Sequence, residues 1–526
     1  MTPGTTEPRL AEQRTSDRTL LSVAKGGGFL AVGSVFATGS RFVVALIMAR
    51  VLGVDDYGAY NLSVSLAFAL ASTGNLGVDA AMERYLAVFA ARRDDASLRG
   101  TVRIGVVSSL IGGLVVAAAV FAFAPLMAAR IFDDTSLVPL FRLVALIVPV
   151  LVITTVLSAA MRGFRRMDQS AFADNIVQPV FRTAVIAGLA IIGFNAYVAM
   201  IVFGLSLVAS LSVLVVLLRR RLADVAAHAR VREHVRGVLT FSFPFWLSGL
   251  LAQFRKSVQP VLLGAFRDVA SVGIFSVAAS ANAIGQTINL SITKSLRPVL
   301  AQVLDAGDHA QTERLYRTTT RWTISVSLPF FIVLVLYPRA VLQIFGESFQ
   351  AGAAALTVLA FSELANAASG TSGTIIDMSG YNTVKVVNKV VWVTLSLGLN
   401  VLLIPRFGIM GAAIAALSSN AAMQAMRAIE VWVLARLNPY DRMTLKPVAA
   451  AAIAFVPGVA IRQWSGGALS VVELVLSALA VGLVYIAALA AFGFEEDDRL
   501  VLRAVGRQLR PRRRRGRSRR GSSPGA

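Results

Sequence analysis

The sequence lacks cysteine altogether and contains only three histidines among its 526 residues. Without cysteine, the chain can form no disulfides, zinc–thiolate sites or iron–sulfur clusters. The histidines, His228, His234 and His309, do not have the spacing of a ligand set. We therefore expect no metal site, no cofactor and no metal-dependent catalysis.

Charged residues are also scarce. They make up 15% of the chain, whereas 56% of the residues are hydrophobic and the mean hydropathy is +0.69. One globular core cannot bury so much apolar surface, so most of it must face lipid. The apolar runs are continuous rather than alternating, which favours helices over barrel strands. The sequence therefore predicts an all-α polytopic membrane protein.

Apolar runs of about 20 residues, the length that a helix needs to cross the hydrocarbon core, occur about fourteen times. We place these helices at 27–50, 57–88, 104–128, 137–161, 172–194, 196–218, 238–264, 269–294, 321–338, 351–378, 386–404, 409–435, 446–463 and 469–492. The first 25 residues are polar and contain no short apolar core before a cleavage site. We therefore expect no removable signal peptide.

The basic residues alternate between the two sides of these helices. Cytoplasmic connections are enriched in Lys and Arg. If the N-terminus is cytoplasmic, the outer connections contain one arginine each or none, namely Arg50, Arg130, Arg267, Arg339, Arg406 and Arg462. Most of the excess that gives a net charge of +22 then lies in the inner connections and tails. We expect a multi-pass protein of the cell (cytoplasmic) membrane, with both termini in the cytoplasm.

A pattern from the first half of the chain recurs in the second half. RFVVALIMARVLGVDDYGAY at 41–60 is related to KSVQPVLLGAFRDVASVGIF at 256–275 by an offset of 215 residues. Two further anchors keep this order, Phe132 with Phe345 at an offset of 213 and Gly163 with Gly380 at 217. Each copy contains an even number of helices, so an axis along the membrane normal relates them, with a cavity between the copies.

The repeat predicts two six-helix lobes, as parallel repeats, followed by two C-terminal helices. The segments are a cytoplasmic N-terminal tail at 1–25, an N-lobe at 26–218, a cytoplasmic inter-lobe linker at 219–237, a C-lobe at 238–436, helices thirteen and fourteen at 437–494, and a basic cytoplasmic tail at 495–526. The basic tail should contact anionic membrane lipids. Nucleic acid is not an expected partner.

Arg41 and Lys256 occupy equivalent positions in the two copies. Each lies well inside its apolar run, about 12–14 Å below the outer end. A cation at that depth costs about 2.5–3.5 kcal/mol even on the most lenient insertion scale. Such a side chain should face water, a partner or a substrate.

Acidic residues in the predicted helices can neutralise some of the buried cations. Glu430 follows Arg427 by three residues and can pair with it, and Glu363 can pair with Arg182. The sequence offers no comparable acid near the midplane for the remaining three cations, Arg41, Arg255 and Lys256. We predict that these three bind a diphosphate in a positively charged cavity between the lobes. The alternative is that carboxylates neutralise each of them.

Further polar residues are candidates for the same cavity. Arg84 is equivalent to Arg297, and with Lys294 they would surround the cytoplasmic mouth, although cations at cytoplasmic helix ends are common. Glu363 and Asp377 could carry a coupling proton or sodium ion, or form salt bridges. The following residues could contact sugar hydroxyls or neighbouring helices: Asn61, Asn75, Asn282, Asn289, Asn366, Tyr60, Tyr85 and Tyr381.

Three segments carry a resemblance to a known family: ARVLGVDDYGAYNLSVSLAFAL after the first helix, GNLGVDAAMERYLA at the end of the second, and MRGFRRMD after the fourth. Over residues 20–495 the chain resembles the polysaccharide-biosynthesis flippases of the multidrug/oligosaccharidyl-lipid/polysaccharide exporter superfamily. The resemblance implies a transporter rather than an enzyme. It would move a polyprenyl-diphosphate-linked oligosaccharide to the outer leaflet by alternating access, alongside a polysaccharide polymerase and glycosyltransferases.

Other functions fit parts of the pattern. A lipid II flippase shares the fourteen-helix plan and a basic cavity. A multidrug antiporter would favour an acidic cavity for cationic drugs and typically has twelve helices. A membrane enzyme of glycan polymerisation or glycosyl transfer normally needs a large outer loop, and the outer connections here are short. Asp55, Asp56 and Asp268 lie in two of these connections, where we expect helix capping rather than catalysis.

Overall fold

The structure is a computed structural model that describes residues 6–223, 235–464 and 469–493. These ranges contain helices and no strand. The first part comprises α1 (Thr6–Gly74), α2 (Val78–Arg92), α3 (Asp95–Arg130), η1 (Thr135–Leu137), α4 (Val138–Gly163), α5 (Met167–Phe172), η2 (Ala173–Val177), α6 (Gln178–Leu189) and α7 (Ala196–Ala223). The second comprises α8 (Val235–Phe266), α9 (Val269–Asp305), α10 (His309–Leu336), α11 (Pro338–Gln343), η3 (Glu347–Gly352), α12 (Ala353–Ala368), α13 (Ser372–Met378), α14 (Asn382–Ala435), η4 (Arg442–Thr444), α15 (Leu445–Trp464) and α16 (Val471–Ala491).

Nine helices in the described part of the chain are long and apolar enough to cross a membrane. α1 and α14 each contain two helical stretches that meet at a glycine with positive φ, Gly53 at 73° and Gly408 at 56°. Glycine adopts such dihedrals without steric penalty. The predicted class, an all-helical multi-pass membrane protein, is confirmed. The count of fourteen membrane helices and the boundaries of the lobes stay predictions.

Several predicted helix boundaries were wrong. α1 begins at Thr6, upstream of the expected start at residue 27. A turn at 75–77 divides the run predicted at 57–88 because Leu76 and Gly77 both have positive φ. A Cβ on Gly77 would also lie 2.3 Å from the Ser242 carbonyl oxygen of α8, so only glycine fits there. Most of the inter-lobe linker and the basic tail at 495–526 lie outside the described residues.

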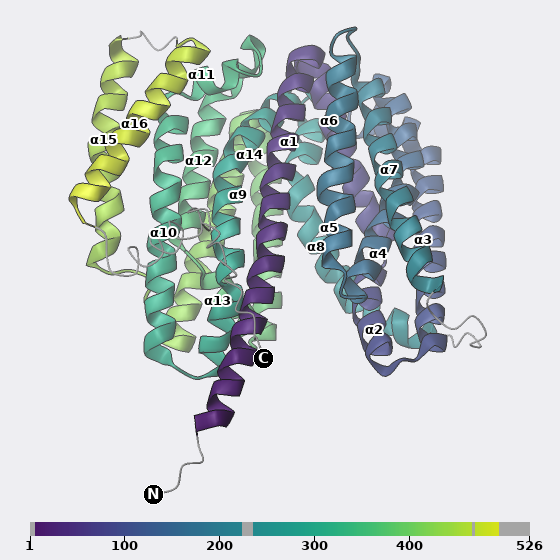
Figure 1. Ribbon diagram of the computed structural model, residues 1–526. Coiled ribbons are helices and arrows are strands. Elements are labelled where there is room, and N and C mark those ends of the chain that lie inside the picture. The colour runs from purple at the N-terminus through teal and green to yellow at the C-terminus, as the bar shows by residue number, and fades with distance from the viewer. Residues whose placement is uncertain (1–5, 224–234, 465–468, 494–526) are drawn as a thin grey trace, which may run out of the picture.

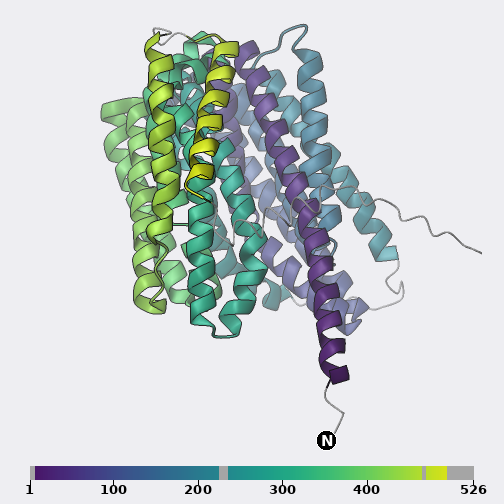
Figure 2. The same cartoon turned by 60° about the vertical axis from the view of Figure 1, so that its left-hand side comes forward.

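The helices form two groups (Figure 1). α2 to α7 lie on one side and α10 to α16 on the other, with α1, α8 and α9 between them. We use N-lobe for α1–α7 and C-lobe for α8–α14. α15 and α16 pack against α10, on the side of the C-lobe away from the N-lobe (Figure 2). The most extensive contact between the lobes joins α1 to α9.

The backbones of α1 and α9 touch at a pair of glycines, near the upper end in Figure 1. A Cβ on Gly58 would lie 1.7 Å from the carbonyl oxygen of Val269, and one on Gly273 would lie 2.2 Å from that of Val54. The offset of 215 relates both glycines to each other and both valines to each other. The contact is therefore reciprocal, as a two-fold relation between the lobes requires.

A second pair of contacts follows the same relation. Phe345, between α11 and η3, packs against Phe42 of α1 with ring centroids 5.4 Å apart. Its equivalent, Phe132, packs against α8, where a Cβ on Gly264 would lie 3.3 Å from the ring. Arg50 adds a hydrogen bond of 2.7 Å from Nε to the Ile344 carbonyl oxygen. Loops of each lobe therefore cover the first helix of the other lobe at the upper end.

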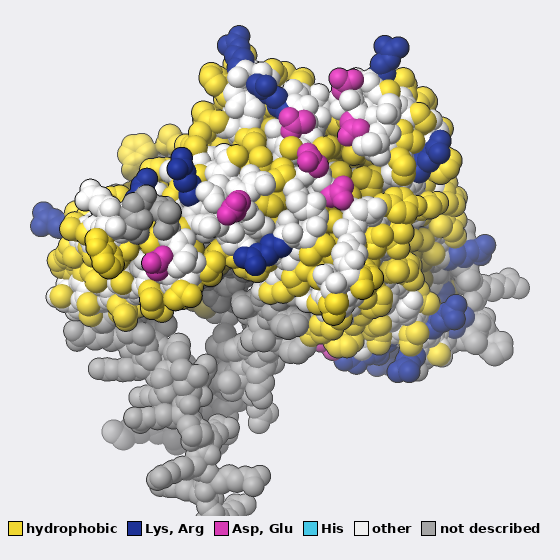
Figure 3. Space-filling view, turned by 90° about the horizontal axis from the view of Figure 1, so that it is seen from above, with side chains coloured by type: hydrophobic (Ala, Val, Ile, Leu, Met, Phe, Trp, Pro, Cys, Tyr) yellow, Lys and Arg dark blue, Asp and Glu magenta, His cyan; other side chains and the backbone are white. Residues whose placement is uncertain are grey.

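Acidic side chains form a band across the middle of this upper face (Figure 3). Asp55, Asp133, Asp268 and Glu347 are exposed residues of the connections there. Asp268 caps α9 by accepting a hydrogen bond of 2.6 Å from the Ser271 amide, which confirms its predicted role. Asp56 instead accepts one of 3.3 Å from the Ala196 amide at the start of α7.

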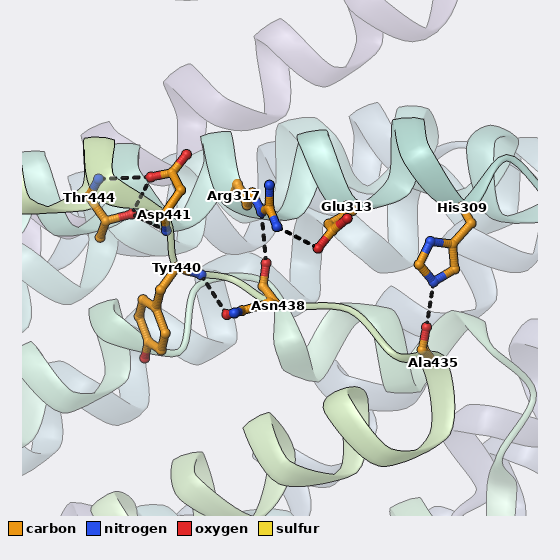
Figure 4. A network of polar contacts seen from close by, with 8 residues as sticks. All are labelled: His309, Glu313, Arg317, Ala435, Asn438, Tyr440, Asp441 and Thr444. Carbon is orange, nitrogen blue, oxygen red and sulfur yellow. Dashed lines mark hydrogen bonds and ion pairs between the residues drawn. The ribbon is translucent and has the colours of Figure 1, made fainter.

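The loop between α14 and η4 is fixed to the start of α10 (Figure 4). A ring nitrogen of His309 contacts the Ala435 carbonyl oxygen at 2.8 Å. Arg317 donates to the Asn438 carbonyl oxygen at 3.3 Å and to Glu313 at 2.7 Å. Farther along α10, buried side chains pack against α15 and α16. The two C-terminal helices are thereby attached to the C-lobe.

We expect Gly58→Ala to favour separation of the lobes at the upper end, because the added methyl group would overlap the Val269 carbonyl group. Overpacking of this kind costs about 1–3 kcal/mol, which shifts a two-state equilibrium about 5- to 150-fold. Spin labels at Asp133→Cys and Glu347→Cys report the separation, and no native cysteine interferes.

Gly39→Ala, on the first helical stretch of α1, is the control, because its Cβ would meet nothing within 4 Å. It should leave the distance distribution between the labels unchanged. An unchanged distribution in Gly58→Ala as well would show that the glycine contact does not hold the lobes together.

Candidate functional site

Four basic side chains from three helices of the two lobes interact electrostatically in sequence, one with the next. They are Arg41 of α1, Arg182 of α6, and Arg255 and Lys256 of α8. Lys256 interacts electrostatically with both Arg255 and Arg41, and Arg41 interacts with Arg182. The structure therefore brings together the three cations that the sequence assigned to one cavity. Arg182, which we expected in a salt bridge, joins them.

Hydrogen bonds next to these cations fix the three helices relative to one another. The hydroxyl groups of Ser40 on α1 and Thr183 on α6 lie 2.6 Å apart. On the second helical stretch of α1, beyond Gly53, the Ser65 carbonyl oxygen accepts a hydrogen bond of 3.1 Å from the Ser257 hydroxyl of α8. Each of these residues except Ser65 adjoins a cation in the sequence. The ties between the helices therefore also set the positions of the charges.

The cations differ in their surroundings. The side chains of Arg41, Arg255 and Lys256 are exposed, although they project from helices that pack together. The Arg182 guanidinium lies 5.9 Å from the centre of the Phe203 ring, and its Nε is buried without a hydrogen-bond partner among the described residues. A buried donor left without a partner is costly. Such a group of mutually repelling donors favours binding of an anion that accepts hydrogen bonds.

A chain of polar contacts continues from Arg255 into the C-lobe. The Arg255 guanidinium lies 5.7 Å from the centre of the Trp392 ring. The Trp392 indole N–H donates to Asn420 Oδ1 at 3.2 Å, and the Asn420 amide donates to the Ser362 hydroxyl at 2.9 Å. Trp392 itself is buried, so the Arg255 guanidinium lies against a ring that is held within the C-lobe.

Glu363 of α12 lies next to this chain, with only 8% of its surface exposed. Its Oε1 accepts hydrogen bonds from the side-chain amides of Asn289 at 2.9 Å and Asn366 at 3.3 Å. The cation that interacts with Glu363 is Arg255. The predicted pairing of Glu363 with Arg182 is therefore wrong, because Arg182 lies in the N-lobe beside Arg41.

Two acidic side chains lie near Arg427 of α14. Arg427 interacts electrostatically with Asp377 of α13 and with Glu430, its neighbour on the same helix. The predicted interaction of Arg427 with Glu430 is thus present. Asp377 is exposed, and its proximity to Arg427 fits a salt-bridge role better than a free site for a coupling ion.

Two of the three residues predicted at the cytoplasmic mouth, Arg84 and Arg297, have described side chains. The Arg84 guanidinium of α2 lies 4.4 Å from the centre of the Phe241 ring of α8, so it bridges the two lobes. Arg297 is exposed on α9, and the side chain of Lys294 lies outside the described residues. A ring of all three cations around a mouth stays a prediction.

The sequence did not identify the polar chain in the C-lobe. Asn289 and Asn366 were candidates for sugar contacts, and they bond to Glu363 instead. Nothing in the run at 386–404 distinguishes Trp392 from a lipid-facing aromatic residue. The available signal was the pair Asn420 and Gln424, which lie one helical turn apart on α14. Among the described residues, no group of three or more acidic or histidine side chains could hold a metal ion.

Comparison with known proteins gives a consistent set of similarities. A family model described as "Polysaccharide biosynthesis protein" matches residues 23–304, more than half of the chain. A protein described as "Probable flippase AglR", from Haloferax volcanii, is 26% identical over 234 residues. That match covers 43% of this chain and 45% of the relative, so the chain spans less than half the length of that protein.

Two solved structures show the fold. The lipid II flippase MurJ, in an inward closed conformation, has a TM-score of 0.68 at 12% identity, over 88% of this chain and 98% of that chain. A multidrug resistance MATE family transporter, in an inward-facing conformation, has a TM-score of 0.60 at 15% identity, over 76% of this chain and 94% of that chain.

We expect Thr183→Val to weaken the attachment of α6 to α1, because it removes the hydroxyl group beside Ser40. The free energy of unfolding should fall by about 0.5–1.5 kcal/mol, measured by denaturant unfolding in mild detergent. Thr155→Val is the control, since its exposed hydroxyl bonds only to the Leu151 carbonyl oxygen of its own helix. Equal losses in both variants would argue against the tie between α1 and α6.

Proposed function

Because this chain belongs to the polysaccharide biosynthesis protein family, we propose that it is a lipid-linked glycan flippase of the cell membrane. Its substrate is a polyprenyl-diphosphate-linked oligosaccharide, which it moves from the cytoplasmic to the outer leaflet by alternating access. The observation that carries the proposal is the group of four cations, Arg41, Arg182, Arg255 and Lys256, between the lobes.

The chemistry of these cations selects the substrate class. A diphosphate presents only acceptor oxygens, which arginine can bind in bidentate fashion and lysine can bind as a point charge. The same group would repel the cationic compounds that multidrug antiporters export. An enzyme of glycan assembly would need reactive groups in a large outer loop, and the upper face consists of short connections. A transporter is therefore the better account.

We infer alternating access from the difference between the two ends of the molecule. The Gly58–Gly273 contact closes the upper end, which we assign to the outer side because the predicted cytoplasmic N-terminus lies at the opposite end (Figure 1). Arg84 and Arg297 would attract the phosphorylated headgroup from the cytoplasmic leaflet. The tail at 495–526 would contact anionic lipids there, and a polysaccharide polymerase and glycosyltransferases would act before or after the transfer.

Reconstituted flipping tests the proposal. Vesicles containing the protein and a fluorescent polyprenyl-diphosphate oligosaccharide are exposed to an external glycosidase, and the initial rate at which the glycan becomes accessible is measured. Arg41→Gln and Lys256→Gln should each lower this rate about tenfold or more, since a charge-assisted hydrogen bond contributes about 1.5–3 kcal/mol. Arg130→Gln, which removes an exposed charge at the end of α3, should not lower it.

Parallel assays separate the other transporter classes. Lipid II replaces the oligosaccharide in one arm, and efflux of a cationic dye is measured in another. Transport of the dye without any flipping of the glycolipid would overturn the proposal. Full flipping activity in both Arg41→Gln and Lys256→Gln would overturn the role of the cations.

A further inference from the structure

Two tyrosines on the second helical stretch of α1 lie near the Arg182 guanidinium. Tyr57 and Tyr60 flank Gly58, the glycine that touches α9, and both of their hydroxyl groups interact electrostatically with Arg182. The two side chains are only 2% and 5% exposed. α1 therefore places two buried hydroxyl groups next to one of the four cations.

The two hydroxyl groups differ in their partners. The Tyr57 hydroxyl interacts with the side chains of Asn61, one turn farther along α1, and Ser280 of α9. The Tyr60 hydroxyl has no hydrogen-bond partner among the described residues, and the charged side chain that acts on it is Arg182. A buried hydroxyl group without a partner costs free energy. The position of Tyr60 therefore favours a ligand that accepts its hydrogen bond.

The equivalent positions of the C-lobe show that the fold does not require this hydroxyl group. The offset of 215 aligns Tyr60 with Phe275, which is equally buried and belongs to the same apolar core. The same offset relates the positive-φ glycines after α6 and within α14, and it aligns Arg182 with Leu397. Packing at these positions is thus achieved with apolar side chains in the other lobe. The hydroxyl and the guanidinium of the N-lobe need another explanation.

Arg182 is the second donor at this place. Its Nε is buried and has no hydrogen-bond partner among the described residues, and its charge is repelled by that of Arg41. A guanidinium group only donates, and a phenolic hydroxyl can donate to the same acceptor. A sugar hydroxyl would satisfy Tyr60 but would leave the positive charge of Arg182 unbalanced. A phosphate oxygen serves both groups, because it accepts hydrogen bonds and is negatively charged.

We propose that Tyr60 is a substrate-binding residue, whose hydroxyl group donates a hydrogen bond to the same phosphate of the bound diphosphate as the Arg182 guanidinium does. The identity of the anion rests on the proposed function. The Tyr60 ring is held by the core, so its hydroxyl group has a fixed place, whereas Lys256 is a point charge on a flexible stem. Tyr60 therefore orients the headgroup on the N-lobe side.

Binding of farnesyl diphosphate to the purified full-length protein, followed by calorimetry, tests this assignment. Tyr60→Phe should raise the Kd of the probe about tenfold or more, because it removes a hydrogen bond to a charged acceptor. Tyr197→Phe is the matched control, since it removes an exposed hydroxyl group from α7. The control should leave the Kd unchanged.

Two further measurements separate binding from a purely structural role. The midpoint of denaturant unfolding without the probe should be no lower in Tyr60→Phe than in the wild type, because phenylalanine fills the equivalent position at Phe275. In an Arg182→Gln background, where three cations still bind the probe, Tyr60→Phe should raise the Kd less than about threefold, since both donors serve one phosphate. A hydroxyl group that only supports packing predicts a lower midpoint and equal losses of affinity in both backgrounds.

The outcomes separate this inference from the flippase proposal. An unchanged Kd in Tyr60→Phe, or an equal loss of affinity with and without Arg182, overturns the role of Tyr60 and leaves the flippase proposal standing. Wild-type protein that binds no probe overturns both the role of Tyr60 and the anion site.

Discussion

The lobes are joined most extensively by α1 and α9, whose backbones touch. No side chain fits at Gly58 or Gly273, so the two helices approach as closely as their main chains allow. The offset that relates these glycines also relates Arg41 to Lys256, and the charges of these two residues interact.

The two lobes share a fold but differ in their interiors. The offset of 217 that relates Gly163 to Gly380 aligns the buried Phe203 and Leu207 of the N-lobe with Asn420 and Gln424 of the C-lobe. The N-lobe carries Arg41 and Arg182, and the C-lobe carries Arg255 and Lys256.

The sequence predicted the features that depend on composition and on the internal repeat. It did not predict contacts that depend on the direction in which a side chain points. The excess of apolar residues predicted the class, and the offset of 215 paired Arg41 with Lys256, whose charges interact in the structure. Depth along a helix gave Glu363 the wrong partner, because it does not specify the direction in which a side chain points or the lobe that it faces. Trp392 carried no signal, since its role depends on Arg255 of another helix.

Because α15 and α16 pack against α10, the C-lobe together with these helices is larger than the N-lobe. These helices widen the perimeter that the C-lobe presents to the lipid, and the loop held by His309 and Arg317 makes them travel with it. A rotation of the C-lobe must therefore displace more surrounding lipid than an equal rotation of the N-lobe. During the proposed alternating access, we expect the N-lobe to rotate farther in the bilayer than the C-lobe does.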